Sequence, residues 1–350
     1  MKICNSFFLK LKHNFFSLLL LLFTICILLF STQNIESAKS GLALWVTSIV
    51  PSLFPFFIAA ELLSHSSIPR ILSKLFTPVL KPVFNISGVG IFAFFMGLIS
   101  GYPVSAKIIV NFRENNMCSK EECERLLSFT NNSSPLFIIG SVGISLFKSS
   151  TIGILLYFSH LLASFTVGYI FRFWKSSKEK LLSSYNSFSN DKMQTVNILN
   201  FGEILGKSIS SAISTIFMVG GFVVFFSVII SILNTSGITN IITYIFNPIC
   251  SNLNIPNSVS YAVFNGLLEN TNGIFLISNI KLKQLSINLI LTSFLLGFGG
   301  ICVFLQIFDI VKKSDLSIKP YIIGKILQGC FSVFYTFFLI QICPFFRFDL

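Results

Sequence analysis

The chain has 350 residues, of which 53% are hydrophobic and 11% are charged, and its formal net charge is +12. A soluble domain carries about 25% charged residues, and 42 phenylalanines are too many for one water-soluble core of this size. The composition therefore predicts an all-α polytopic protein of the lipid bilayer, because the alternating strands of a membrane barrel are absent. Without an arginine-rich face interleaved with aromatics, the basic excess indicates cytoplasmic loops, and no nucleic-acid partner is expected.

In the N-terminal region, residues 1–40, three lysines at positions 2, 10 and 12 precede an apolar run at 15–30. This run is short for a membrane span and is similar in length to the core of a signal peptide. The polar segment 31–38 that follows could hold a cleavage site. We favour an uncleaved N-terminal hydrophobic helix and a short linker, with a cytoplasmic N-terminus, and a cleaved signal-like segment is the alternative.

Apolar segments of helical length recur along the rest of the chain, near 41–64, 88–110, 126–147, 150–173, 203–233, 257–280, 284–308 and 321–343. One long polar segment, 175–202, divides them and predicts a cytoplasmic linker. The predicted organisation is therefore a first repeat at 41–174 and a second repeat at 203–350.

The two halves resemble each other at a fixed offset. Pro78 corresponds to Pro248, 170 positions later, and the apolar positions of 68–79 correspond to apolar positions of 238–249. One register later, FMGLI at 95–99 matches FNGLL at 264–268. The apolar residues of the first amphipathic segment follow helical spacing, and both segments are too short to span, so we expect them to lie along the membrane interface.

Each half contains an apolar segment with a polar turn at its middle. The segment 88–110 carries SGYP at 100–103, and the segment 257–280 carries ENTNG at 269–273. Two half-length helices around a turn predict a re-entrant hairpin, which is tolerated at membrane depth where protein or a cavity surrounds it.

The distribution of basic residues supports this topology. With both hairpins re-entrant, 20 of the 25 basic residues, Lys107 and Lys325 among them, fall on the cytoplasmic side. The five on the other side are Lys39, Lys148, Lys281, Lys283 and Arg347. If 88–110 crossed the membrane completely, the basic linker at 175–202 would lie outside, against the preference of basic residues for the cytoplasmic side. The two repeats are therefore predicted to be inverted relative to each other, as in many secondary transporters.

A second kind of interruption lies in the segment 126–147, where Asn131-Asn132-Ser133-Ser134-Pro135 stands between apolar residues. It is either a surface loop or a break inside one helix. Ser119 and Glu122 fit a capping box that starts a helix just before it and already supplies the surface connection. We therefore favour a helix break, with the segment Gly297–Gly300 as its partner in the second repeat.

Several stretches resemble YlbJ-type sporulation integral membrane proteins. They are GLISGYPVSAK (97–107), SKEECERLLSF (119–129), NNSSPLFIIGSVG (131–143), GLLENTNGI (266–274) and LLGFGGICVFLQI (295–307). The resemblance implies a nucleoside-recognition gate domain, similar to half-repeats of concentrative nucleoside transporters. It also implies an endospore-forming bacterium, expression in the mother cell and movement of dipicolinic acid toward the forespore.

The predicted substrate-binding residues come from the two tips and the two breaks. They are Ser100, Gly101, Tyr102, Pro103, Lys107, Asn131, Asn132, Ser133, Ser134, Glu269, Asn270, Thr271, Asn272, Gly299, Gly300 and Gln306. Half-helix N-termini there offer unpaired amides to an anion, and Gly and Pro disrupt regular pairing.

Individual side chains at these positions have alternative roles. Tyr102 either stacks on a planar ring or plugs the tip, and Lys107 either neutralises a carboxylate or reaches toward the cytoplasm. Glu269 either binds a coupling cation or proton, pairs with Lys107, or caps the adjacent turn. Gln306 is expected to donate to the substrate.

The predicted function is transport of a small anionic substrate, dipicolinate, from the mother cell toward the forespore by alternating access of the hairpins. The predicted location is the cell membrane or the outer forespore membrane. A non-transporting scaffold of spore formation and a nucleoside transporter are the alternatives. Neither a catalytic constellation nor a cofactor or metal-binding motif is present, so an enzyme is not expected. The sequence leaves homo-oligomer formation open.

Overall fold

The computed structural model describes all residues except 1, 176–200, 253–254, 283, 344–345 and 347–350. The predicted linker therefore lies almost entirely outside the described residues. The described chain is helical and contains no strand, and five of its helices are long and apolar enough to cross a membrane. They are Ser31–Ser64, Ser150–Phe171, Phe201–Thr235, Leu285–Val311 and Lys319–Ile342. The predicted all-α, multi-pass class is confirmed.

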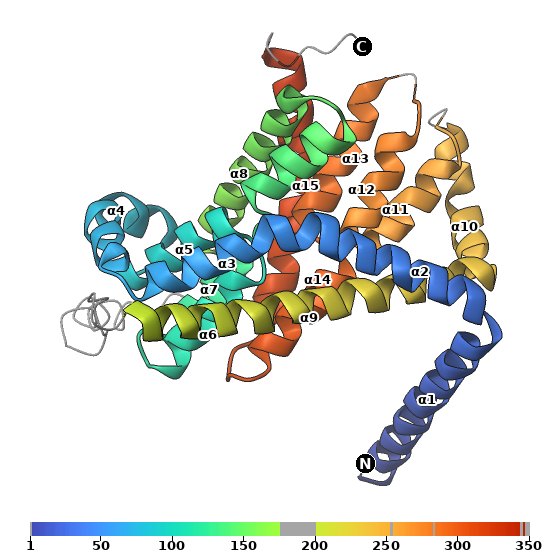
Figure 1. Ribbon diagram of the computed structural model, residues 1–350, viewed down its shortest axis with the longest axis horizontal. Helices are drawn as coiled ribbons and strands as arrows, with labels where there is room; N and C mark the ends of the chain where they lie inside the picture. Colours follow the sequence, from blue (N-terminus) through green and yellow to red (C-terminus); the bar gives the residue numbers. More distant parts are fainter. Residues whose placement is uncertain (1, 176–200, 253–254, 283, 344–345, 347–350) are drawn as a thin grey trace.

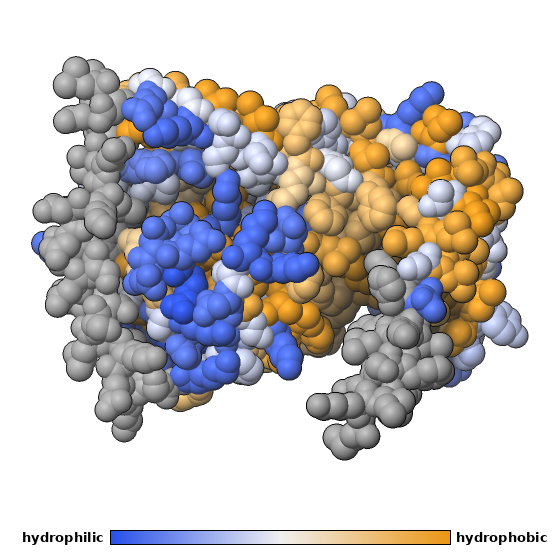
Figure 2. Space-filling model, turned by 90° about the horizontal axis from the view of Figure 1, so that it is seen from below, coloured by the Kyte–Doolittle hydropathy of each residue, from blue (hydrophilic) through white to orange (hydrophobic). Residues whose placement is uncertain are grey.

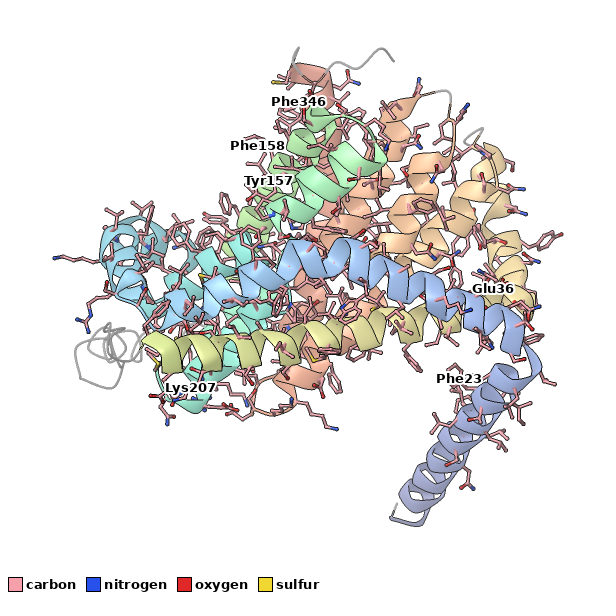
Figure 3. The ribbon with its side chains drawn as sticks, viewed as in Figure 1. Phe23, Glu36, Tyr157, Phe158, Lys207 and Phe346 are labelled. Carbon is pink, nitrogen blue, oxygen red and sulfur yellow. The ribbon has the colours of Figure 1, made fainter. Side chains whose placement is uncertain are left out.

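The N-terminal helix α1 (Lys2–Leu29) extends away from the other helices (Figure 1). Its Phe23, labelled in Figure 3, packs edge-on against Phe225 with ring centroids 5.6 Å apart. The polar segment 31–40, which the sequence predicts as a linker, is instead helical. It forms α2 (Ser31–Leu44), which continues through η1 (Trp45–Ile49) into α3 (Val50–Ser64).

Close packing on a second long helix explains this difference. Helix α9 (Phe201–Thr235) lies beside α2 and α3, and Gly41 leaves no room for a side chain against Ser227 and Val224. The indole of Trp45 donates a hydrogen bond of 3.0 Å to the carbonyl oxygen of Ile216. These contacts order a segment whose polarity alone indicates a loop.

The remaining elements repeat in order. The first repeat continues with α4 (Ile68–Phe84), α5 (Gly88–Ser100), α6 (Val104–Glu114), α7 (Lys120–Thr130), η2 (Leu136–Leu146) and α8 (Ser150–Phe171). After α9 the second repeat continues with α10 (Ile238–Asn252), α11 (Ser258–Leu268), α12 (Asn270–Asn279), α13 (Leu285–Phe298), α14 (Gly300–Val311) and α15 (Lys319–Ile342).

The repeats are inverted. Helices α3 and α9 run side by side in opposite directions, and α4 and α10 lie at opposite ends of the molecule (Figure 1). Helix α4 meets α5 at 90° and exposes Ile71, Leu75 and Val79, as expected for a helix that lies along an interface. Both predicted hairpins form, as α5–α6 and α11–α12.

Polar side chains gather at one end of the molecule. Figure 2 shows them in the left half of the view, whereas the right half is mostly apolar. In Figure 1 the same side holds the connections α6–α7 and α14–α15. A double hydrogen bond joins these connections, because Arg113 donates to both carboxylate oxygens of Asp315 over 2.8 and 2.9 Å.

Candidate functional site

The first hairpin tip docks on the first helix break through its backbone. Helix α5 ends at Ser100, and the residue after it, Gly101, has a φ of +78° that strongly favours glycine. A side chain there would also meet Ser134, whose backbone nitrogen would lie 2.9 Å from the added carbon. The next residue, Tyr102, donates its backbone N–H to the carbonyl oxygen of Asn132 over 2.8 Å.

The first break lies where the sequence predicts it. Helix α7 ends at Thr130, residues 131–134 have no regular secondary structure, and η2 begins at Leu136. Ser119 accepts from the N–H of Glu122 over 3.2 Å and caps α7, as expected. The Glu122 carboxylate, however, accepts from the N–H of Ser87 at 2.6 Å, so it links α7 to the start of α5.

The two asparagines of the break hold its backbone instead of facing the cavity. Asn131 accepts from the Ser105 hydroxyl over 2.8 Å and donates to the carbonyl of Leu127. Asn132 donates to the carbonyl of Phe129 over 3.0 Å and to the Ser164 hydroxyl. Both are almost fully buried. Neighbouring residues already use the polar atoms of these two amides in this conformation, and their contact with substrate stays a prediction.

The second hairpin tip is a single residue. Glu269 separates α11 from α12, and its carboxylate accepts from the N–H groups of Thr271 (3.1 Å) and Asn272 (2.7 Å). Of the three roles considered for Glu269, this geometry corresponds to the cap. Asn270, Thr271 and Asn272 form the first turn of α12, although the sequence places them in the turn itself.

Lys107 binds α9 in this conformation, and its expected role toward a substrate carboxylate stays a prediction. Its ammonium donates to the hydroxyls of Ser211 and Thr215 on α9, and the half-buried side chain joins the first hairpin to this long helix. The predicted pair between Lys107 and Glu269 is therefore not formed here.

The second break consists of Gly299 and Gly300, with φ of +89° and +82°. The second tip docks here, since a side chain at Gly300 would lie 3.3 Å from the backbone nitrogen of Asn270. One and a half turns along α14, Gln306 donates to the sulfur of Cys302 over 3.5 Å. Both breaks thus receive the tip of the hairpin in their own repeat.

Both tips and both broken segments contribute to one small central cavity of about 40 Å³. Its polar lining includes Tyr102, Ser133, Ser134, Glu269, Thr271 and Gln306. Two of these polar groups, the Ser133 hydroxyl and Oε1 of Gln306, form no hydrogen bond of normal geometry with the described residues. Both side-chain polar atoms of Asn270, which lies outside the lining, are in the same state. The hydroxyl of Tyr102 lies beside Ser133 and Asn270. Buried polar groups left in this state indicate a place for water or a ligand.

A larger cavity of about 750 Å³ adjoins the central one. The two share Ile49, Ser52, Phe137, Glu269 and Thr271. The larger cavity is lined by hydroxyls from α2, η1, η2 and α9, and its volume is in the range of small-molecule sites. Of the predicted residues, Ser100, Pro103, Lys107, Asn131, Asn132, Asn270, Gly299 and Gly300 line neither cavity, and Asn272 lines the larger one alone.

A polar cluster behind the first break was missed by the sequence reasoning. Gln328 on α15 donates to Oδ1 of Asn132 over 2.7 Å, and His160 on α8 accepts from the N–H of Ser133 over 3.3 Å. Lys325, predicted on the cytoplasmic side, is 1% exposed inside α15 and donates to the carbonyl of Asn131. Ionisable residues inside apolar helices are functional candidates, and this signal could have identified Lys325 and His160.

Comparison with known proteins places the chain in a family. The family model described as Gate, nucleoside recognition, matches residues 46–173 and 216–314. The sporulation integral membrane protein YlbJ of Bacillus subtilis (strain 168) is 33% identical over 316 residues, which cover 87% of this chain and 77% of that protein. The solved structure of CNTnw in an inward-facing, substrate-bound state matches with a TM-score of 0.51 and 12% identity. That match covers 92% of this chain and 86% of the other. The chain belongs to the Gate family, and its fold is similar to that of a concentrative nucleoside transporter.

Proposed function

We propose that this member of the Gate family is a secondary transporter that moves a small aromatic dicarboxylate, dipicolinate, from the mother cell toward the forespore during sporulation. The observation that carries the proposal is that both hairpin tips, the first helix break and α14, the helix that follows the second break, line one cavity with unsatisfied polar atoms. Such discontinuous helices at the midplane typify transporter binding sites. The sporulation relative supports the biological setting.

Alternating access explains the two adjoining cavities. The central cavity, at about 40 Å³, is too small for an aromatic dicarboxylate, whereas the adjoining cavity has room for one. The larger cavity reaches Ser37 near the start of α2 and Asn234 near the end of α9. With the basic connections in the cytoplasm, this is the opposite side of the membrane. In this proposal a rearrangement of the hairpins enlarges the central cavity and opens it to either side in turn.

The charges around the cavity bear on how a dicarboxylate would bind. Glu269 is the one charged side chain that lines either cavity in the described part of the chain, and two amides of its own helix hold its carboxylate. Positive charge comes from Lys107 and Lys325, which lie behind the lining. A dicarboxylate would therefore be bound mainly by hydroxyl, amide and backbone dipoles, with the two ammonium groups acting at longer range.

A nucleoside is the second candidate substrate. The specific observation in its favour is the uncharged, hydroxyl-rich lining together with one carboxylate that can accept hydrogen bonds from sugar hydroxyls. The two substrates make opposite demands on Glu269, since its charge repels a dicarboxylate and suits a nucleoside.

The deciding experiment uses the purified protein in liposomes. Uptake of dipicolinate and of a nucleoside is measured with and without a pH gradient, for the wild type and for Glu269→Gln. The matched control is Glu36→Gln, an exposed carboxylate near the start of α2, labelled in Figure 3. Saturable dipicolinate uptake that responds to Glu269→Gln and not to Glu36→Gln supports the proposal. Nucleoside uptake alone favours the second candidate, and uptake of neither solute contradicts both.

A further inference from the structure

Lys325 is a buried lysine, and a long-range effect on the proposed substrate does not explain why its side chain ends at the first helix break. Its ammonium donates to the carbonyl oxygen of Asn131 over 3.0 Å and to Oε1 of Gln328 over 2.9 Å. Both acceptors are uncharged. No carboxylate oxygen of the described chain lies within 4.0 Å of this ammonium. Since an isolated buried charge is very costly, its position requires a physical reason.

Close packing of α15 brings this lysine to the break. At Gly324 an added side chain would overlap the carbonyl of Ser128 on α7, so only glycine permits the observed approach. The Lys325 side chain then passes Gly299, where an added carbon would lie 3.6 Å from the lysine Cε atom. One lysine therefore lies between the breaks of both repeats.

The groups around the ammonium come from three helices. Nε2 of His160, on α8, accepts a hydrogen bond from the backbone N–H of Ser133, so the imidazole is neutral in this arrangement. The same Nε2 lies 3.4 Å from the side-chain nitrogen of Gln328. Tyr321, one turn earlier on α15, is buried with its hydroxyl unpaired among the described residues. The negative pole near Lys325 is thus the C-terminal end of α7, where carbonyls carry a partial negative charge.

The protein's own donors occupy the carbonyls of this helix end. The carbonyl of Phe129 accepts from Ser164, and that of Thr130 accepts from the N–H of Asn132. The carbonyl of Asn131 accepts from Lys325, and that of Asn132 accepts from Tyr102. Lys325 is the charged one among these four donors. Each of the four carbonyl oxygens thus already accepts a hydrogen bond from the protein, so none of the four is left unpaired for a metal ion.

We propose that the ammonium of Lys325 is a resident cation, occupying the broken end of α7 where a discontinuous membrane helix otherwise coordinates a monovalent metal ion. The first hairpin tip, which docks on the same break, then closes without sodium or another metal ion. The inference rests on the geometry of the break and is independent of the substrate proposed above.

The first test measures thermal unfolding of the purified wild-type protein. Sodium, potassium and lithium chloride are compared with choline chloride at constant ionic strength. The Tm is expected to be the same in all four salts. A saturable rise of Tm in one metal salt would show that the site takes a metal ion and would overturn the proposal.

The second test removes the ammonium. Lys325→Ala leaves space at the Asn131 carbonyl, and we expect it to lower the Tm in choline and to gain a saturable stabilisation by a monovalent metal ion. At a metal concentration of about 100 times Kd, the Tm of this variant should rise by roughly 5 °C above its value in choline. Lys325→Met keeps most of the side-chain volume and should not respond. The control Lys207→Ala removes an exposed lysine of α9, and its Tm should be the same in every salt.

The yield of folded protein covers the case in which Lys325→Ala is too unstable to unfold reversibly. This variant is purified in parallel in sodium and in choline, and monodisperse protein is quantified by size exclusion. A higher yield in the metal salt supports the proposal. Equal failure in both salts, or a stable variant that ignores metal ions, overturns it.

Discussion

Gln328 on α15 donates a hydrogen bond of 2.7 Å to Oδ1 of Asn132, a residue 196 positions earlier in the chain. The bond ties the last helix of the second repeat to the helix break of the first. Both side chains are buried, and Gln328 also accepts from Lys325. The break is therefore held in place by α15, while its hydroxyls at Ser133 and Ser134 remain available to the cavity.

Removal of either partner should destabilise the fold. Gln328→Ala leaves the side-chain oxygen Oδ1 of Asn132 buried without this donor, which costs about 1–3 kcal/mol. Asn132→Ala should cost a similar amount, and the double variant should cost less than the sum of the two. Unfolding in detergent measures this coupling, which we expect to be about 0.5–3 kcal/mol. Strictly additive effects would show that the bond contributes nothing.

The glycine that brings α15 to α7 should not tolerate a side chain. Gly324→Ala places a methyl group against the Ser128 carbonyl, and such overpacking typically costs about 1–3 kcal/mol. Gly221→Ala on α9 is the matched control, since nothing lies within 4 Å of the added carbon. It should be neutral or slightly stabilising, because Ala favours a helix over Gly by up to about 1 kcal/mol. Equal Tm values for the two variants would contradict the packing described here.

The repeats, the hairpins and the breaks could be predicted because they leave local marks. A proline or a pair of glycines inside an apolar run favours an interruption of the helix. Such a mark does not always break it, because Pro55 and the pair Gly220-Gly221 lie inside continuous helices. The roles of Asn131, Asn132 and Lys325 could not be predicted in the same way. Whether a polar side chain faces a cavity or a neighbouring helix depends on the packing of α8 and α15 onto the break, and those helices are distant in sequence.

The distribution of basic residues along the sequence predicts the topology but not the position of each lysine. It indicates inverted repeats, and the structure confirms them, yet it places Lys325 among the cytoplasmic residues. In the structure this lysine is fully buried, and Lys107 binds hydroxyls of α9. A basic residue reports topology only where it lies at a helix end or in a connection between helices, as Arg113 does in the last turn of α6.

The ion pair between Arg113 and Asp315 gives a pH-dependent contribution at the polar end of the molecule. The hydrogen bond from Arg113 lowers the pKa of Asp315 below its ordinary value of 3.8. Because the folded-state pKa is the lower one, the stabilisation is present above about pH 4 and is lost as the pH falls through the folded-state value.

Asp315→Asn should therefore lower the Tm slightly at neutral pH and have no effect in strong acid. The loss should not exceed about 1 kcal/mol for a pair this exposed, and it should shrink at high salt. Parallel unfolding curves at several pH values check this. A difference that persists below the folded-state pKa would assign the effect to something other than the charge.

The ring of Tyr102 should contribute to the binding of a planar substrate. Tyr102→Phe keeps the ring, whereas Tyr102→Ala removes it from the central cavity. Aromatic contacts contribute about 0.5–1.5 kcal/mol, so the apparent affinity in liposome uptake should fall by up to about tenfold for Ala alone. Tyr169→Ala, on an exposed face of α8, is the control. Equal affinities for Phe and Ala would assign Tyr102 a role without ring stacking.

The most direct measurement asks whether the transported solute occupies the central cavity. Cys302 lines that cavity, whereas Cys118 is buried elsewhere and Cys330 is exposed. The rate at which a membrane-permeant thiol reagent modifies each cysteine is followed by mass spectrometry, with and without the solute that liposomes accumulate. Protection should be saturable at Cys302 and absent at Cys118 and Cys330. Unchanged modification of Cys302 at a saturating solute concentration would contradict transport through this cavity.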